Sequence, residues 1–296
     1  RTIYEVPMNL EKQGVANYII DKMRLGPLTS KRDMEGWERF VSRIVNPKRE
    51  VTIALVGKYT SLADSYLSHL EAFTHAGAAS ECKVRIKFVD SDELVKNDPA
   101  SILGDVHGVI VPGGFGIRGV EGKINAARYA RENNIPFLGV CLGFQIATIE
   151  FCRHVLGLEM ASSTEFNPDT PDPVICIMDE QKGIVNMGAT MRLGAQDVHV
   201  LEGSKACELY GGKTLISERH RHRYEVNPDY ISRIEEAGWK FTGRSECGTR
   251  MEIGELENHP YFVASQFHPE FKSKPWSPSP LHQGLVNAAI RYMESR

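Results

Sequence analysis

Between residues 51 and 156 the sequence alternates between short, continuous apolar runs and amphipathic helical stretches, and this alternation most constrains the fold. Continuous apolar strands joined by helices are typical of a parallel sheet that helices cover on both faces. In such sheets, ligand chemistry lies where the carboxyl ends of strands meet the starts of helices. We therefore predict a three-layer α/β fold with a mostly parallel central sheet. The expected strands are 51–56, 83–89, 107–111 and 137–140, and the expected helices are 64–79, 123–132 and 142–156.

The pattern changes after Gly157. Residues 157–267 carry shorter strand signals separated by Gly and Pro, such as 174–178 and 262–267. Short strands with turns between them favour antiparallel pairing. We therefore predict a small antiparallel extension of the sheet, followed by a return of the chain to the main sheet.

The first 48 residues have helical periodicity and no strand signal. One helical stretch runs to a stop at Gly26-Pro27, and a second covers about 34–45. We place a domain boundary near residue 49, which divides the chain into a linker at 1–48 and the α/β domain at 49–296.

Charge and composition exclude several classes of partner. The chain has 296 residues with 35 Lys and Arg against 38 Asp and Glu, a formal net charge of −3, so no basic field favours nucleic acid or an anionic membrane. The apolar runs are far shorter than the roughly 20 residues of a membrane span. Six cysteines without a CxxC pair favour a reducing cytoplasm over a disulfide framework. Because the chain starts at Arg1 without an apolar leader, we expect a piece of a longer protein.

The sharpest chemical signal is Gly139-Val-Cys141-Leu-Gly143, which stands between an expected strand and an expected helix. It has the shape of the nucleophile elbow G-x-S-x-G, with sulfur in place of oxygen. The glycines leave room for a strained turn, and the helix that follows directs its first amides at the thiol and favours the thiolate. Cys141 is therefore a candidate nucleophile. The alternative is a buried cysteine that only packs.

A second segment offers a base and its orienting group. His268-Pro269-Glu270 directly follows the apolar run that ends at Phe267. Residues two apart in an extended chain project to the same side, and Pro269 restricts the backbone between them. In this interpretation His268 takes the proton of the nucleophile and Glu270 fixes the imidazole. The alternative is a solvated loop histidine beside a surface carboxylate.

The third segment is the glycine loop 112–119, which follows an expected strand. Gly114, Gly116 and Gly119 satisfy the dinucleotide fingerprint G-x-G-x-x-G. That fingerprint should follow the first strand and run straight into a helix, whereas we expect residues 119–122 to delay the helix. We prefer an amide-rich loop in which the Gly114 and Leu142 N–H groups form an oxyanion hole. The alternative is a flexible glycine turn.

Two other motifs fail on spacing or charge. Gly211-Gly-Lys-Thr214 lacks the earlier glycine of a phosphate loop, because Cys207 stands there. His220 and His222 could begin a metal site, but three flanking arginines would repel a cation. We therefore predict no metal and an anion-facing strand at 219–223, with a solvated basic stretch as the alternative.

Several segments together resemble the glutaminase half of the CTP synthase family. The elbow and the His-Pro-Glu run belong to all class-I, triad-type glutamine amidotransferases, whereas the glycine loop and the arginine–histidine run point to CTP synthases. The resemblance covers essentially the whole chain and implies that residues 1–48 are a linker and the end of an amidoligase domain. The segments are Pro112–Gly116, Gly139–Gly143, Ser163–Phe166, Met191–Gly194, Glu218–Asn227 and His268–Glu270.

This resemblance implies hydrolysis of L-glutamine through a γ-glutamyl thioester. It implies a triad of Cys141, His268 and Glu270, without a metal. By the same resemblance, the other residues take three roles: Gly114 and Leu142 form the oxyanion hole, Gln145, Glu165, Arg223, Tyr224 and Phe115 bind glutamine, and Arg118, Gly119 and Glu121 form a GTP lid.

The resemblance also implies partners for the domain. Ammonia would pass to an amidoligase domain, which binds ATP, Mg²⁺ and UTP and makes CTP, and GTP would be an allosteric activator. The full-length protein would be a cytoplasmic homotetramer. Two other hypotheses for the function stay open. The chain could be a cysteine peptidase or γ-glutamyl hydrolase of related fold, or a non-catalytic, nucleotide-binding regulatory module.

Overall fold

The structure is a computed structural model that describes all residues except 1, 27–32, 59, 61 and 179–190. The strands are β1 (Arg49–Gly57), β2 (Cys82–Asp90), β3 (Gly108–Val111), β4 (Phe137–Val140), β5 (Ser162–Ser163), β6 (Pro173–Cys176), β7 (Arg192–Val200), β8 (Leu215–His222), β9 (Glu225–Val226), β10 (Trp239–Arg244), β11 (Met251–Leu256) and β12 (Phe262–Ser265). The helices are α1 (Val6–Lys12), α2 (Val15–Met23), α3 (Glu35–Val45), α4 (Leu67–Ala79), α5 (Glu93–Lys96), α6 (Pro99–Leu103), α7 (Val120–Glu132), α8 (Leu142–His154), α9 (Lys205–Leu209), α10 (Pro228–Glu236) and α11 (Pro280–Glu294). The short 3₁₀ helices within the described residues are η1 (Ile3–Glu5), η2 (Ala63–Tyr66) and η5 (Pro269–Lys272).

The central sheet has the strand order β2-β1-β3-β4-β12-β11-β10-β7-β8. Neighbours from β2 to β12 pair in parallel, and neighbours from β12 to β8 pair antiparallel. A smaller sheet, β5-β6-β9, forms separately. The predicted α/β class and the return of the chain to the main sheet are confirmed, because β12 pairs directly with β4. The antiparallel part is larger than expected and supplies four strands beyond β12.

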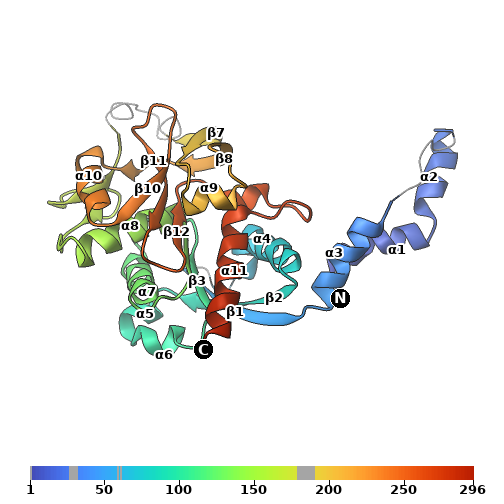
Figure 1. Cartoon of the computed structure of the whole chain (residues 1–296), viewed down its shortest axis with the longest axis horizontal. Coiled ribbons are helices and arrows are strands. Elements are labelled where there is room, and N and C mark those ends of the chain that lie inside the picture. The colour runs from blue at the N-terminus through green and yellow to red at the C-terminus, as the bar shows by residue number, and fades with distance from the viewer. Residues whose placement is uncertain (1, 27–32, 59, 61, 179–190) are drawn as a thin grey trace.

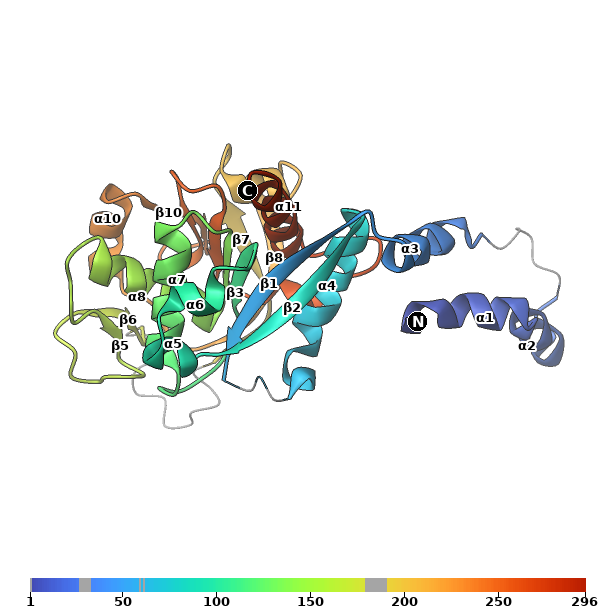
Figure 2. The ribbon, with the colours of Figure 1, turned by 90° about the horizontal axis from the view of Figure 1, so that it is seen from below.

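Two apolar cores lie on opposite faces of this sheet. One core contains side chains of α7 and α8, and the other contains side chains of α4 and α11. Figure 2 shows these two pairs of helices on either side of the sheet. Residues of β4 are completely buried between the two cores, as a strand of a covered parallel sheet requires. Across the parallel pair β4 and β12, the rings of Phe137 and Phe262 stack with centroids 4.3 Å apart.

The N-terminal helices α1, α2 and α3 extend away from the sheet (Figure 1). Tyr4 of η1 contacts the domain, because its hydroxyl lies 2.7 Å from Nε2 of His75 on α4, and Phe40 of α3 packs against the same imidazole. The Trp37 indole N–H donates to the Tyr4 carbonyl at 2.7 Å. The helical character expected for this region is present, although α2 ends at Met23 and the expected stop at Gly26-Pro27 lies partly outside the described residues. The first strand begins at Arg49, and the boundary between domains stays a prediction.

One expectation about the glycine loop is wrong. Helix α7 begins at Val120, directly after Gly119, so residues 119–122 do not delay it. The reason is close packing: a Cβ on Gly122 would lie 1.7 Å from the Ser91 carbonyl oxygen. A glycine in this first turn therefore lets the helix approach the neighbouring backbone. The dinucleotide fingerprint requires a glycine loop after the first strand. Here the loop follows the third strand, β3, so the fingerprint still does not apply.

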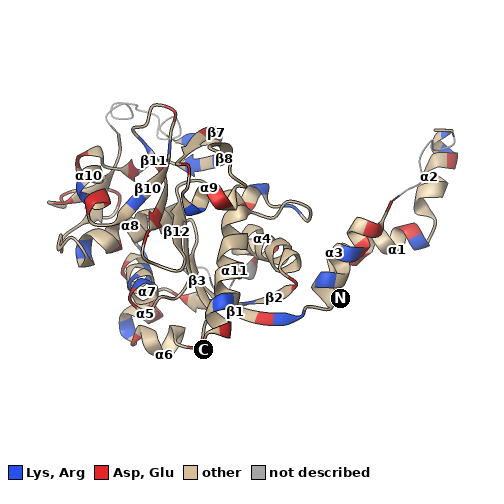
Figure 3. Cartoon of the chain, in the orientation of Figure 1, with Lys and Arg blue, Asp and Glu red and all other residues tan. Residues whose placement is uncertain are grey.

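Both signs of charge are interspersed along the helices (Figure 3). This distribution agrees with the balanced composition of the sequence. Among the described residues, no helix has both the length and the apolar character needed to cross a bilayer.

We predict that Phe262→Ala destabilises the domain strongly. The substitution removes a fully buried ring that stacks on Phe137, and such truncations cost about 3–5 kcal/mol, or roughly 10 °C in Tm for a domain of this size. Thermal unfolding followed by circular dichroism measures the change. The matched control is Leu193→Ala, because Leu193 is 58% exposed and its loss should leave Tm nearly unchanged. Equal Tm values for the two variants would contradict this view of the core.

Candidate active site

The turn between β4 and α8 holds Cys141 in an unusual backbone conformation. Its φ is 54° and its ψ is −100°, a region that L-residues rarely adopt. The Cys141 N–H donates to the Ser265 carbonyl at 2.7 Å, which fixes the turn against β12. Leu142 is the first residue of α8, so its N–H has no partner one helical turn back. The turn thus directs a thiol and a main-chain amide toward the same edge of the sheet.

His268 and Glu270 reach this edge from the end of β12. The Nδ1 atom of His268 lies 2.7 Å from Glu270 Oε1, and both side chains are buried. Gly113 follows β3 and lies directly against the imidazole: a Cβ there would be 2.8 Å from His268 Cε1 and 3.6 Å from Cys141 Cβ. Because β3, β4 and β12 are neighbours with parallel directions, their carboxyl ends bring these groups together.

The β7–β8 hairpin covers the same site from the antiparallel part of the sheet. The His268 N–H donates to the Arg219 carbonyl at 2.8 Å, and the Cys141 thiol approaches the Arg221 carbonyl at 3.9 Å. The hairpin is joined to the rest of the sheet by only two residue pairs between β7 and β10, at Gly243 and Arg244. With so short a pairing, β8 lies against the carboxyl ends of the parallel strands, where it contacts Cys141 and His268.

A cleft of about 170 Å³ opens at these residues. It is smaller than the roughly 300–1,000 Å³ pockets of drug-sized ligands, which suits a small substrate. Of the residues predicted for the site, the cleft brings together the three triad candidates with Gly114 and Phe115. Its lining consists of Ser65, Tyr66, Ser68, His69, Pro112, Gly113, Gly114, Phe115, Cys141, Arg221, His268, Glu270 and Phe271.

Four of the expected substrate-binding residues lie outside this lining. The Gln145 side-chain amide donates to the Tyr224 carbonyl at 3.1 Å, which joins α8 to the segment after β8. Glu165 Oε1 accepts from the Gly116 N–H at 2.8 Å, so its carboxylate holds the glycine loop. Burial and the Glu165 carboxylate raise the pKa of Tyr224. Arg223 directly precedes Tyr224, between β8 and β9.

The residues expected in a GTP lid lie where the glycine loop enters α7. Arg118 is exposed, and its guanidinium lies 3.8 Å from the Asp92 carboxylate and 3.4 Å from the Lys58 carbonyl. Gly119 precedes the first residue of α7 with φ 74°. Glu121 accepts two hydrogen bonds from Arg153, at 2.9 and 3.1 Å. The structure therefore gives Glu121 a partner within the domain.

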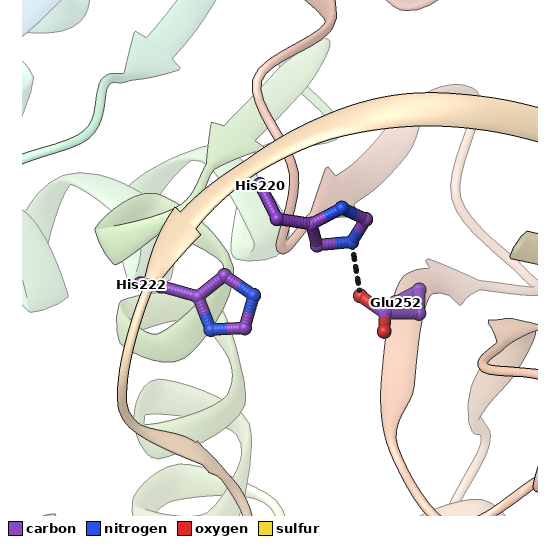
Figure 4. Close-up of side chains that lie close together, drawn as sticks. All are labelled: His220, His222 and Glu252. Carbon is purple, nitrogen blue, oxygen red and sulfur yellow. Dashed lines mark hydrogen bonds and ion pairs between the residues drawn. The ribbon is translucent and has the colours of Figure 1, made fainter. Parts of the chain in front are cut away.

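The two histidines of the arginine–histidine run point inward toward Glu252 of β11 (Figure 4). Their possible ligand atoms all lie within 4.8 Å of one another. However, Glu252 already accepts from Arg192 at 2.7 Å and lies 2.9 Å from His220 Nε2. Burial lowers the pKa of His222 to about 3. Because the Glu252 carboxylate is already paired with the Arg192 guanidinium, it is a poor ligand for a cation. We interpret the cluster as a buried network that stabilises the hairpin.

The charges of the candidate triad support one another. Burial alone would lower the pKa of His268, but the Cys141 charge, a hydrogen bond with Cys141 and the Glu270 carboxylate raise it to about 10. Burial alone would raise the pKa of Glu270, but His69 and His268 lower it to about 2. The arrangement therefore favours the imidazolium form of His268 beside an ionised Glu270.

A comparison with known families agrees with this geometry. The family model described as "Glutamine amidotransferase class-I" matches residues 61–288. The chain belongs to the class-I glutamine amidotransferases.

Similar proteins show which kind of class-I amidotransferase this domain is. The CTP synthase of Syntrophus aciditrophicus is 49% identical over 99% of this chain, and that of Methanococcus maripaludis is 52% identical over 98%. The chain spans about half the length of these relatives, 54% and 55%. A solved glutaminase domain of Trypanosoma brucei CTPS with bound acivicin is 42% identical, with a TM-score of 0.76 over 81% of this chain and 94% of that one. The chain is a glutaminase domain of the CTP synthase type, which confirms the resemblance seen in the sequence.

Sequence reasoning missed four residues that contribute to this amidotransferase site. Gly113 belongs to the glycine loop already singled out, so its close approach to the imidazole could have been suspected. The Arg219 and Arg221 carbonyls contact the site through the backbone, which side-chain motifs do not reveal. His69 lines the cleft from α4, and a single histidine on an expected helix carries no signal.

We predict that Cys141→Ala lowers the pKa of His268 by several units. The substitution removes the neighbouring charge and hydrogen bond that raise this pKa, while the burial that lowers it remains. NMR titration of protein labelled with ¹⁵N-histidine gives the value. Cys152→Ala is the matched control, because Cys152 is also a buried cysteine, at the far end of α8. A His268 pKa that is the same in both variants would show that Cys141 and His268 are not coupled.

Proposed function

We propose that Cys141 of this domain hydrolyses L-glutamine to glutamate and ammonia through a γ-glutamyl thioester, with His268 and Glu270 completing a triad. The observation that carries the proposal is the meeting of three groups in one cleft. They are a cysteine in a strained turn at a helix start, an imidazole beside it and a carboxylate 2.7 Å from that imidazole. Such an arrangement is suited to nucleophilic catalysis.

The first half of the reaction forms the thioester. The Cys141 thiolate attacks the side-chain amide carbon of glutamine, and the carbonyl π electrons move onto oxygen. The Gly114 and Leu142 N–H groups stabilise the oxyanion, because preorganised amides act most strongly where charge develops. His268 then protonates the departing nitrogen, the C–N bond breaks and ammonia leaves. Glu270 orients the imidazole throughout.

The second half hydrolyses the thioester. His268 is now neutral and takes a proton from a water molecule, whose oxygen attacks the thioester carbon. A second oxyanion forms in the same hole and collapses with cleavage of the C–S bond. Glutamate leaves, the Cys141 thiolate is restored and His268 carries the proton, so the balance is glutamine plus water giving glutamate plus ammonia.

The substrate amino acid would be held around the glycine loop. Glu165 is a natural partner for the α-ammonium group, and Arg223 can bind the α-carboxylate in a bidentate manner. The Gln145 side-chain amide contacts the Tyr224 carbonyl, and Phe115 lines the cleft. Because Glu165 Oε1 now accepts from Gly116, substrate binding would exchange this bond or share it.

The whole-protein role extends the proposal. Ammonia would pass to an amidoligase domain, of which residues 1–48 would be the end, and that domain would use ATP and Mg²⁺ to aminate UTP in a homotetrameric enzyme. GTP would activate the glutaminase by closing a lid that contains Arg118, Gly119 and Glu121. The exposed guanidinium of Arg118 at the end of a glycine loop supports this assignment, because it is available to a phosphate.

We predict that Cys141→Ser abolishes ammonia release from glutamine and leaves the fold intact. The hydroxyl is a far weaker nucleophile than the thiol, and about 10⁴-fold or more of the rate should be lost when the covalent route is removed. Coupled ammonia assays and circular dichroism measure the two properties. Hydrolysis of glutamine by Cys141→Ser at the wild-type rate would show that Cys141 is not the nucleophile. Acivicin should label Cys141 in the wild type and not in His268→Ala.

We also predict that the isolated chain hydrolyses glutamine slowly, and that GTP together with the amidoligase domain accelerates it. The expected reason is that the glycine loop and the start of α7 are completed by these partners. Ammonia release is measured with each partner alone and with both, and Arg118→Ala should weaken the GTP response selectively. Rapid hydrolysis by the chain alone, unchanged by either partner, would contradict this coupling. Release of glutamate from γ-glutamyl peptides instead of free glutamine would favour a γ-glutamyl hydrolase.

A further inference from the structure

Two histidines outside the triad form a buried polar chain that ends at Glu270. His69 of α4 and His282 of α11 are 4% and 0% exposed, and His69 Nδ1 lies 3.0 Å from His282 Nε2. On the far side, His282 Nδ1 lies 2.8 Å from the Ser279 hydroxyl. On the near side, His69 Nε2 lies 3.6 Å from Glu270 Oε1. We propose that His69 is a positioning residue that orients Glu270 through this relay of Ser279, His282 and His69.

The negative charge of Glu270 determines which atom donates in each hydrogen bond of the relay. If Ser279 donates to His282 Nδ1, then His282 Nε2–H donates to His69 Nδ1. His69 then presents its Nε2–H to the carboxylate. The opposite direction would aim a nitrogen lone pair at an anion in a buried site, which is unfavourable. The ionised state of Glu270 therefore selects the first direction.

Both histidines of the relay are neutral in this environment. Burial lowers the pKa of His69 and lowers the pKa of His282 to about 3. The charged or titratable groups that act on the relay and on Glu270 come from four elements, and only Glu270 is a full negative charge in contact with His69. They are His268 and Glu270 at the start of η5, His69 on α4, His282 on α11 and Glu218 on β8.

Glu270 has few other groups to hold it. Its Oε1 atom lies 2.7 Å from His268 Nδ1 and 3.6 Å from His69 Nε2. Its Oε2 atom is buried and has no hydrogen-bond partner in the part of the chain that the structure describes. A buried carboxylate with so few partners depends on each of them for its charge and orientation. His69 is therefore placed to fix the carboxylate without touching substrate.

The relay is anchored in the backbone around the start of α11. The Ser279 N–H donates to the Ser273 hydroxyl at 3.0 Å, and Ser279 is 1% exposed. Ser273 follows η5, the element that contains Glu270. Ser279, where the relay begins, and Glu270, where it ends, thus lie in one connected segment.

The inference rests on the triad proposed above, and it is tested with His69→Leu, His69→Gln and the control His259→Leu. Leucine removes the polar relay, whereas glutamine keeps an N–H donor near the Nε2 position. His259 is a buried histidine at the far end of β12 that contacts the Ala130 carbonyl and not the triad. All variants are measured as the full chain, by ammonia release from saturating glutamine across pH.

We expect His69→Leu to lower kcat about fivefold with KM changed less than about twofold, the size of one neutral polar contact. The acid limb of its pH profile should move to higher pH, because Glu270 loses a contact that favours its ionised form. His69→Gln should recover most of the rate, and His259→Leu should keep the wild-type profile. A wild-type rate and profile in His69→Leu, or equal losses in the leucine and glutamine variants, would overturn the proposal.

A second readout does not depend on turnover. In ¹⁵N-histidine NMR spectra of the wild type, His69 should be neutral with its proton on Nε2. A cationic His69, or one with its proton on Nδ1, would overturn the relay even if the enzyme is active. Conversely, an inactive wild type that shows this tautomer would contradict the proposed function and leave the relay standing. Ser279→Ala should weaken the preference for the Nε2 proton, because it removes the donor that begins the relay.

Discussion

Cys141 holds a backbone conformation that costs on the order of 1–3 kcal/mol, and it does so between a strand and a helix that are almost completely buried. The flanking structure maintains this strain, because β4 is fixed between β3 and β12 and α8 is packed in one of the two cores. The same turn directs the thiol and the first amide of α8 to one point. His268, Glu270 and the glycine loop line the cleft around that point.

The sheet topology explains how distant segments meet there. The glycine loop, the cysteine turn and the His-Pro-Glu segment follow three neighbouring parallel strands, so their positions are set by strand register rather than by long loops. The antiparallel hairpin adds a cover: Arg192, His220 and Glu252 join its inner face to β11, and its carbonyls contact Cys141 and His268. Buried charges thus support the site from both halves of the sheet.

The sequence predicted the parts that depend on local pattern. The strand 137–140 agrees with β4 and the helix 142–156 with α8 apart from its last two residues, because apolar runs and a glycine-flanked cysteine are local signals. The antiparallel part is larger than the sequence predicts, since the pairing of β7 with β10 joins segments that are far apart in the chain. The start of α7 differs from the prediction because Gly122 packs closely against the Ser91 backbone, a tertiary contact that the sequence pattern does not show. The contacts of His220 with Glu252 and of His69 with Glu270 arise only from tertiary structure, so no sequence pattern indicated them.

The central claim is that a covalent bond forms between the substrate and the sulfur of Cys141. Its most direct test is mass spectrometry of the protein after acid quenching during ammonia release from L-glutamine. The account predicts a mass increase of one γ-glutamyl group on the peptide that contains Cys141, removable with hydroxylamine as expected for a thioester. Continued ammonia release with that peptide unmodified, or with the adduct on another cysteine, would contradict it.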